Sequence, residues 1–186
     1  MKQYLISDPR YYRPYRFANA FARAYRRFHP DFVCLRDKQT REYPRLARLF
    51  LRQSRRFKAR AILHNDWHLA KKLKAHGVHL SADRAREIKA AARSSLFTIA
   101  SCHSEAEAKR ALKSGSSRVV ISPIFSVANK GRAKGIGFLN ALDPTIRAKT
   151  IALGGIISDD EVSAARETGV FAFASIRYFT KDFRGF

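Results

Sequence analysis

The chain has little cysteine, little acidic charge and no long apolar run, and each shortage excludes a class of protein. Its two cysteines, Cys34 and Cys102, match no zinc-binding or redox-motif spacing. No apolar run approaches the roughly 18 residues of a membrane span. Residues 1–10 lack the apolar core and cleavage site of a signal peptide. We therefore expect a cytoplasmic, reduced protein that does not enter a membrane.

Acidic residues are outnumbered by basic ones. The 37 Lys and Arg residues and 15 Asp and Glu residues give a net charge of +22, which attracts nucleic acid or a phosphorylated small molecule. The basic residues are spread through helical patterns. No RNA-binding aromatic motif or helix-turn-helix pattern accompanies them. We interpret the charge as a solvated basic surface that steers an anionic small molecule, and we do not expect nucleic acid as the partner.

Short apolar runs alternate with helical patterns along the chain, with no linker or internal repeat, which predicts one domain over residues 1–186. Several runs are apolar almost throughout, as strands buried on both faces should be. The expected strands are 3–7, 31–35, 60–64, 77–81, 96–101, 118–122, 150–154 and 171–175. The expected helices lie near 15–27, 42–55, 66–75, 83–92, 104–114 and 158–167. This repetition, without a glycine-rich loop after the first strand, favours an α/β fold, the (β/α)8 TIM barrel, over an open doubly wound sheet.

The chain is short for such a barrel, so some helices should be reduced. Residues 123–149 show little helical pattern, and only eleven residues follow the last expected strand, so a full last helix is missing. Either the tail 179–186 or a second subunit would then cover the barrel edge, which makes a homodimer one expected arrangement. Capping boxes mark two helix starts, at Ser104 with Glu107 and at Ser158 with Glu161.

Charged residues follow several strands, at the barrel end where active sites lie. Arg36, Lys38 and Lys130 are expected to converge as three cations. Asp66, with Asp83 nearby, is suited to Mg²⁺, which binds one or two carboxylates and otherwise substrate phosphates. Cations and a hard metal together predict a pyrophosphate site.

A second anion site is predicted after the seventh strand. Gly154 and Gly155 let backbone N–H groups approach a phosphate, and the helix that begins near Ser158 would support it. Phosphate binding by the loops after strands seven and eight is common in this fold. The residues therefore predict an enzyme that handles two phosphorylated groups.

Four histidines between positions 64 and 79 do not by themselves predict a metal site. They would have to converge from different elements, and no acidic partner stands in zincin order. His68 and His76 are expected to be solvated, and His79 is expected to face the core from a strand.

In order along the chain, these motifs resemble those of the thiamine phosphate synthase / thiazole tautomerase superfamily. The resemblance runs nearly end to end, from YLISD at 4–8 to FASI at 173–176. The matching segments are CLRDK at 34–38, ND at 65–66 with Ala70, GVHLSADR at 77–84, SCHS at 101–104, SPIF at 122–125 with Lys130, and ALGGI at 152–156.

The resemblance implies a synthase that joins hydroxymethylpyrimidine pyrophosphate to thiazole phosphate and releases pyrophosphate in thiamine biosynthesis. The residues that it assigns to the pyrophosphate are Arg36, Lys38, Asn65, Ser101 and Lys130, with Ser101 and Lys130 at the reacting centre. The residues that it assigns to the thiazole phosphate are Gly154, Gly155 and Ser175. It implies Mg²⁺ as the cofactor, held by Asp66 and with Asp83 as the second carboxylate.

The chain departs from the synthase pattern at a few positions. Cys34 replaces a glutamine that helps to hold the pyrimidine substrate. Arg84 stands where the second metal aspartate is expected, with Asp83 one residue early, and an arginine there could instead replace the charge of the metal. Val127 and Asn129 replace two threonines that accompany the lysine. These departures weigh against the synthase and leave phosphate binding intact.

Two other functions remain open at the level of sequence. A thiazole tautomerase shares the barrel and shifts a proton on a carboxythiazole phosphate with the histidine of the S-x-H motif, which is His103 here. A degenerate barrel that binds phosphorylated ligands or RNA without catalysis is the other alternative.

Overall fold

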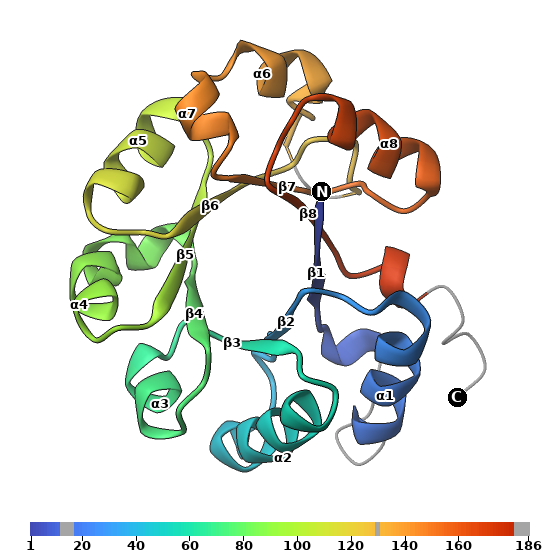
Figure 1. The fold of residues 1–186 in the computed structure, drawn as a ribbon, viewed down its shortest axis with the longest axis vertical. Coiled ribbons are helices and arrows are strands. Elements are labelled where there is room, and N and C mark those ends of the chain that lie inside the picture. The colour runs from blue at the N-terminus through green and yellow to red at the C-terminus, as the bar shows by residue number, and fades with distance from the viewer. Residues whose placement is uncertain (12–16, 129–130, 181–186) are drawn as a thin grey trace.

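The structure is a computed structural model that describes residues 1–11, 17–128 and 131–180. Its eight strands close into a barrel in chain order, and the helices surround it (Figure 1). All neighbouring strands are parallel, including the first and last, which pair Lys2 with Ala172. The predicted (β/α)8 barrel is therefore confirmed.

The strands lie close to their expected ranges. They are β1 (Lys2–Ile6), β2 (Phe32–Leu35), β3 (Arg60–His64), β4 (Gly77–Leu80), β5 (Phe97–Cys102), β6 (Arg118–Ile121), β7 (Thr150–Leu153) and β8 (Ala172–Ser175). All residues of β2, β4 and β8 are buried, as expected for parallel strands that contact helices on one face and the barrel interior on the other.

The helices differ more from expectation. They are α1 (Phe17–Phe28), α2 (Tyr43–Arg56), α3 (Trp67–Lys72), α4 (Ile88–Arg93), α5 (Glu105–Lys113), α6 (Gly135–Ala141), α7 (Pro144–Arg147) and α8 (Asp159–Glu167). Short 3₁₀ segments are η1 (Pro9–Tyr11), η3 (Ala82–Glu87) and η4 (Tyr178–Thr180). Residues 123–149 thus hold two helices where little helix was expected. Asp143 caps α7 by accepting from the N–H of Thr145 at 2.8 Å, with Pro144 at the first turn, a start signal that the sequence prediction missed.

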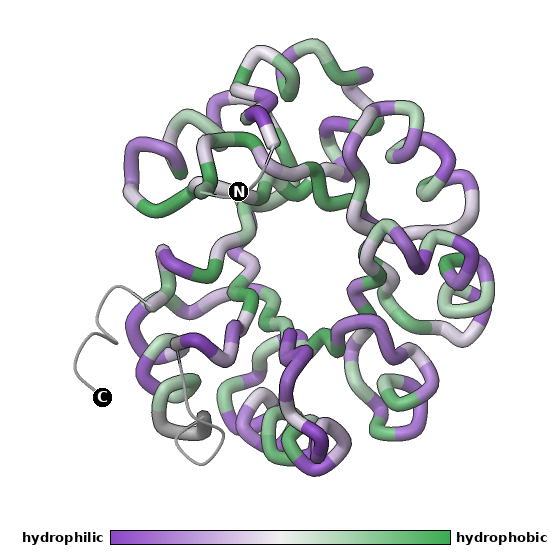
Figure 2. The backbone as a smooth tube through the Cα atoms, turned by 180° about the vertical axis from the view of Figure 1, so that it is seen from behind, coloured by the Kyte–Doolittle hydropathy of each residue, from purple (hydrophilic) through white to green (hydrophobic). Residues whose placement is uncertain are grey.

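The hydrophobic core has two layers because successive side chains of a strand point to opposite faces. One layer fills the barrel and consists of Tyr4, Ile6, Phe32, Cys34, Ile62, Ile99, Val120, Ile151, Ala172 and Ala174. The other lies between the barrel wall and the helices and includes Leu5, Val33 and Phe50. In Figure 2 the barrel wall is largely apolar and the hydrophilic positions gather on the outer helices and loops.

The amino end of the barrel is closed by aromatic rings. Phe32 and Phe97 stack with their centroids 5.4 Å apart, and the guanidinium of Arg118 lies 4.0 Å from the ring centre of Phe171. This packing leaves the carboxyl end of the barrel for ligands, where the predicted site residues stand.

The chain after β8 covers the edge of the barrel next to α1. Phe179 is buried, meets Phe28 edge to face at 5.4 Å between centroids and stacks on Phe173 at 5.7 Å. Only the 3₁₀ segment η4 follows β8 within the described part of the chain, which agrees with the predicted loss of a full last helix. Cover by a second subunit stays a prediction. No helix in the described ranges is long and apolar enough to cross a membrane.

Candidate functional site at the carboxyl end of the barrel

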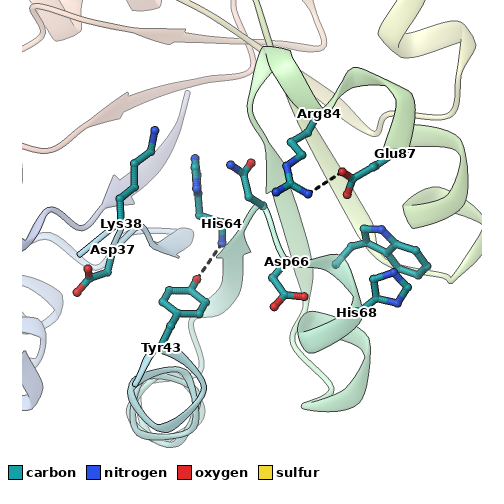
Figure 3. A pocket seen from close by; sticks show the side chains of 10 residues that line it. Asp37, Lys38, Tyr43, His64, Asp66, His68, Arg84 and Glu87 are labelled. Carbon is teal, nitrogen blue, oxygen red and sulfur yellow. Dashed lines mark hydrogen bonds and ion pairs between the residues drawn. The ribbon is translucent and has the colours of Figure 1, made fainter. Parts of the chain in front are cut away.

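A pocket of about 330 Å³ opens beside the carboxyl ends of β2, β3 and β4 (Figure 3). Its lining residues are Asp37, Lys38, Tyr43, His64, Asn65, Asp66, Trp67, His68, Arg84 and Glu87. The pocket therefore brings together three predicted site residues, Lys38, Asn65 and Asp66. It adds Glu87, to which no role was assigned from the sequence, and Arg84, which stands where the second metal aspartate was expected.

Arg36 is positioned by the end of β1. The Ser7 hydroxyl accepts from the Arg36 N–H at 2.9 Å, and the Arg36 guanidinium donates to Asp8 at 3.3 Å. The Asp8 carboxylate also accepts from Nε and Nη2 of Arg10, each at 2.9 Å. Only 3% of the Asp8 side chain is exposed, so it forms a buried carboxylate between two guanidinium groups. The sequence prediction gave Asp8 no role, although its place directly after a strand was a signal.

The electrostatics of Asp8 follow from those two arginines. Burial by itself raises the pKa of the carboxyl. The hydrogen bonds from Arg10 and the charges of Arg10 and Arg36 outweigh this effect, so the pKa lies below its usual value. Asp8 is therefore ionised near neutral pH and can hold both guanidinium groups in place.

Asn65 joins the ends of β3 and β4. Its Oδ1 accepts from the backbone N–H of Ser81 at 2.8 Å and from the Ser81 hydroxyl at 3.0 Å. Its backbone has φ of 62°, a left-handed conformation that asparagine tolerates better than most residues. Because the carboxamide oxygen is used in the fold, the NH₂ group is what remains for an anion, as the prediction requires.

The two carboxylates predicted for a metal have different surroundings. Asp66 is exposed at the pocket and caps α3, accepting from the Leu69 N–H at 2.8 Å. Asp83 is exposed and accepts from the Ser81 hydroxyl, and it is not among the residues that line the pocket. No group of three or more His, Cys, Asp or Glu side chains suited to a metal occurs in the part of the chain that the structure describes.

A polar chain crosses the barrel interior beneath the pocket. Tyr4 Oη lies 3.1 Å from Nδ1 of His79, and Nε2 of His79 lies 3.0 Å from the Ser101 hydroxyl. His79 is 3% exposed, so the prediction that it faces the core is confirmed. His68 and His76 are exposed, also as predicted. These hydrogen bonds connect Ser101, at the carboxyl end of the barrel, to Tyr4 on β1 and His79 on β4. No pattern in the sequence indicated this connection.

Burial determines the charge of the two inner histidines. It lowers the pKa of His79 to about 3, with a contribution from the charges of His64 and Arg36. It lowers the pKa of His64 to about 4, with contributions from Arg36 and Lys38 that outweigh the opposite effect of Asp83. Both imidazoles are therefore neutral near pH 7.

These histidines should make the protein acid-sensitive. A lowered pKa in the fold means that the unfolded chain binds protons first, so stability is complete above about pH 6.5 and falls as the pH drops toward 4 and 3. We expect about 2 kcal/mol lost per histidine at pH 5. Urea unfolding at pH 7.5 and pH 5 measures this. His79→Gln should show about half of the decrease contributed by the pair. A substitution of the exposed His103 should leave the decrease in unfolding free energy between pH 7.5 and pH 5 unchanged. An equal decrease in the native chain and in both variants would contradict the role of His79.

His103 lies at the barrel mouth and is exposed. Its Nδ1 is 3.4 Å from the Ser122 carbonyl oxygen, and its backbone N–H donates to Glu107 at 2.7 Å. The expected capping box is thus altered. Ser104 caps the Glu107 N–H at 3.2 Å, but the glutamate carboxylate accepts from His103 instead of Ser104. At α8 the reciprocal bond forms as expected, with Glu161 accepting from the Ser158 N–H at 2.7 Å.

The Gly154-Gly155 turn packs tightly against the loop after β6. Both glycines have positive φ, of 98° and 73°. Backbone bonds of 2.9 Å run from Ile124 to Leu153 and from Phe125 to Gly154. A Cβ at Gly155 would lie 2.5 Å from the Cβ of Phe125. The turn therefore requires glycine, because the loop after β6 packs where a side chain would stand.

Ser175 and the start of α8, the other parts of the predicted second anion site, differ in how well they suit an anion. The Ser175 hydroxyl donates to the Ile156 carbonyl at 2.7 Å and accepts from the Tyr178 N–H at 3.1 Å, so it ties β8 to the glycine turn. The start of α8 is less suited to an anion than expected. Glu161 accepts from the N–H groups of Ile157 and Ser158, directly before the helix, and Asp159 and Asp160 add negative charge there. Anion binding by the glycine turn stays a prediction.

Lys130 and its neighbour Asn129 lie outside the described residues, so the structure does not place the third cation. Cys34, at the position of the expected glutamine, is fully buried inside the barrel, and burial raises its pKa to about 12. Its neutral thiol therefore offers no polar contact to a substrate at the mouth.

A closed (β/α)8 barrel with basic side chains and a glycine turn at its carboxyl end defines a class, the barrel enzymes that bind phosphorylated substrates. Residues 3–179 match the family model described as thiamine monophosphate synthase, so the chain belongs to that family.

Individual relatives agree with this assignment. The thiamine-phosphate synthase of Proteus mirabilis (strain HI4320) is 29% identical over 153 residues, covering 79% of this chain and 71% of the relative. The putative thiamine-phosphate synthase 2 of Aquifex aeolicus (strain VF5) is 26% identical over 147 residues, covering 77% of this chain and 78% of the relative. The solved thiamine phosphate pyrophosphorylase from Pyrococcus furiosus superposes with a TM-score of 0.77 at 22% identity, covering 99% and 97% of the two chains, which shows the shared fold.

Proposed function

We propose that this chain is a thiamine phosphate synthase. It joins hydroxymethylpyrimidine pyrophosphate to thiazole phosphate and releases pyrophosphate. The observation that carries the proposal is the pocket of Lys38, Asn65 and Asp66 beside the carboxyl ends of three strands, in a chain that belongs to this family. The partners are then phosphorylated small molecules, and the site of action is the cytoplasm.

The basic side chains hold the pyrophosphate group. Arg36, fixed by Asp8, and Lys38 at the pocket supply positive charge. Lys130, which lies outside the described residues, is the proposed third cation. Asn65 and Ser101 donate hydrogen bonds from their NH₂ and hydroxyl groups. As the carbon–oxygen bond to the pyrimidine methylene breaks, its electron pair moves to the pyrophosphate, and these charges stabilise the developing anion.

The other substrate is held on the opposite part of the rim. Gly154 and Gly155 allow backbone N–H groups to approach the thiazole phosphate, and Ser175 keeps the turn in place through its bond to Ile156. The thiazole nitrogen then attacks the pyrimidine methylene carbon and forms the new carbon–nitrogen bond. The role of the protein at this step is to orient the two substrates.

The donor set at the pocket fits Mg²⁺. Asp66 presents an exposed carboxylate that uses one oxygen for its helix cap, and a magnesium ion needs only one or two carboxylates beside phosphate oxygens and water. We propose that Asp66 would hold the ion, with Asp83 as the second carboxylate. When bound, Mg²⁺ supplies charge neutralisation on the leaving pyrophosphate.

Turnover is the direct test. Purified chain, Mg²⁺ and the two substrates should yield thiamine phosphate detected by mass spectrometry, and excess EDTA should lower the rate. No product from protein with a folded circular dichroism spectrum would contradict the proposal. Carboxythiazole phosphate would then be assayed for tautomerisation, with His103→Gln as the variant that should abolish it.

Asp66→Asn tests the metal role separately from the cap. Asparagine keeps an oxygen that can accept from Leu69, so the fold should persist, while the negative charge is lost. We expect kcat to fall at least about a hundredfold at fixed Mg²⁺. Asp143→Asn is the matched control, because Asp143 is also an exposed aspartate that caps a helix, at α7. Equal activity of the two variants would exclude Asp66 as a metal ligand.

A further inference from the structure

We propose that Arg84 is a pyrophosphate-binding residue that supplies part of the positive charge otherwise left to Mg²⁺, so that this chain binds the diphosphate group even without metal. The inference deepens the proposed function and rests on it for the identity of the ligand. It concerns a residue of η3 that stands where the family pattern has the second metal aspartate.

The position of Arg84 is the first argument. It lines the same pocket as Lys38 and Asp66, and it stands in the segment that follows β4. Figure 3 shows its guanidinium above Asp66, on the side of Glu87. Two cations from different strand ends therefore border one pocket, which is the arrangement that a group with two phosphates can bridge.

The hydrogen-bonding capacity of Arg84 is the second argument. Nη1 of Arg84 donates to Glu87 Oε1 at 2.8 Å, and 48% of the Arg84 side chain is exposed. A guanidinium carries five N–H donors in a planar fork, and this bond uses one of them. Glu87 thus orients the group while donors remain for an anion.

The charges around Arg84 are the third argument. Arg84 directly follows Asp83 in the chain and lines the pocket together with Asp66, so its guanidinium lies near both proposed metal carboxylates. A divalent cation at those carboxylates would repel the arginine. Asp83 is moreover bonded to the Ser81 hydroxyl. Arg84 thus places a positive charge beside the proposed metal carboxylates.

The carboxylates of the pocket do not cancel this charge. Asp37 directs its oxygens to its own turn, accepting from the N–H groups of Gln39 and Thr40 and from the Thr40 hydroxyl. Glu87 is paired with Arg84 itself. Asp66, whose carboxylate accepts a helix-cap bond from Leu69, is then the remaining pocket carboxylate beside the two cations Lys38 and Arg84.

The test is calorimetric titration of inorganic pyrophosphate into the full chain, in EDTA and in excess Mg²⁺. The native chain should bind in EDTA, and Arg84→Ala should weaken this metal-free binding about tenfold, the loss typical of one charge-assisted contact. Arg84→Asp should weaken it further and make binding depend on Mg²⁺. Direct titration of Mg²⁺ without pyrophosphate should show tighter metal binding by Arg84→Asp than by the native chain.

Arg86→Ala is the matched control. Arg86 lies in the same 3₁₀ segment, has the same charge, is exposed and does not line the pocket. If Arg84→Ala and Arg86→Ala lose affinity equally, bulk charge explains the effect and the inference is wrong. It is also wrong if the native chain fails to bind pyrophosphate in EDTA. Thermal unfolding midpoints of both variants establish that they are folded.

The outcome for Arg84 can be distinguished from the outcome for the proposed synthase activity. Thiamine phosphate turnover with unchanged metal-free binding in Arg84→Ala would support the synthase and overturn the role of Arg84. Arg84-dependent pyrophosphate binding in a chain without turnover would support the binding site and overturn the synthase.

Discussion

Replacing Asp8 with alanine is expected to lower kcat/KM for the pyrimidine substrate by about a hundredfold, the scale at which misplaced binding groups act. The Asp8 carboxylate is nearly fully buried and holds the guanidinium groups of Arg10 and Arg36. Without it, Arg36 loses its orientation at the end of β2. We also expect a loss of about 2 kcal/mol in the free energy of unfolding, modest because Arg10 is largely exposed to water.

Further variants separate positioning from general damage. Asp8→Asn keeps hydrogen-bond acceptance and should retain more activity than the alanine variant. Asp31→Ala removes another carboxylate with an ion pair, to Lys2 at 2.8 Å, at the opposite end of the barrel, and should leave kcat/KM unchanged. Steady-state kinetics with both substrates measures the effect. A normal KM for the pyrimidine substrate and a normal kcat in Asp8→Ala would refute the role of Asp8.

Gly155→Ala is the second substitution for which we expect a large effect. The new Cβ would lie 2.5 Å from Phe125 Cβ and 2.7 Å from the Ser126 carbonyl oxygen, at φ of 73°. The left-handed backbone and the overlap together should cost about 3 kcal/mol of unfolding free energy. The loop must move to relieve the overlap, so KM for thiazole phosphate should rise about tenfold or more.

Gly169→Ala is the matched control for this substitution. Gly169 has φ of 78°, but a Cβ there meets no atom within 4 Å. It should lose only the backbone component, about 1 kcal/mol, and keep its KM for thiazole phosphate. Urea unfolding and initial-rate kinetics on both variants give the comparison. If both variants lose the same unfolding free energy and have the same KM for thiazole phosphate, the close packing of the loops does not contribute to substrate binding.

The sequence predicted the barrel because its signals are local and repeated. Apolar runs such as 118–122 and 150–154 show burial on both faces of a strand, and short helical patterns between them leave a parallel sheet as the arrangement. The sequence prediction was least accurate for the helices. Residues 135–147 hold two short helices, one of them started by Asp143 and Pro144, and so short a helix has almost no periodicity to detect.

The candidate site was predicted in part for the same reason. Once strand ends are known, parallel strands place the residues after them on one face, so Lys38, Asn65 and Asp66 were expected together and do line one pocket. Hydrogen-bond partners are not local in sequence. The link from Tyr4 through His79 to Ser101 joins three strands, and no pattern along the chain indicates it.

The sequence by itself therefore determined the fold and the end of the barrel that carries the chemistry, because both follow from hydrophobic periodicity and from the direction of the strands. Only the tertiary structure decided which charged groups meet. It placed Asp8 between Arg10 and Arg36 and brought Arg84 to the pocket with Asp66. The reason is physical: the energy of a charge depends on burial and on neighbours a few ångströms away, and residues distant in the chain supply both.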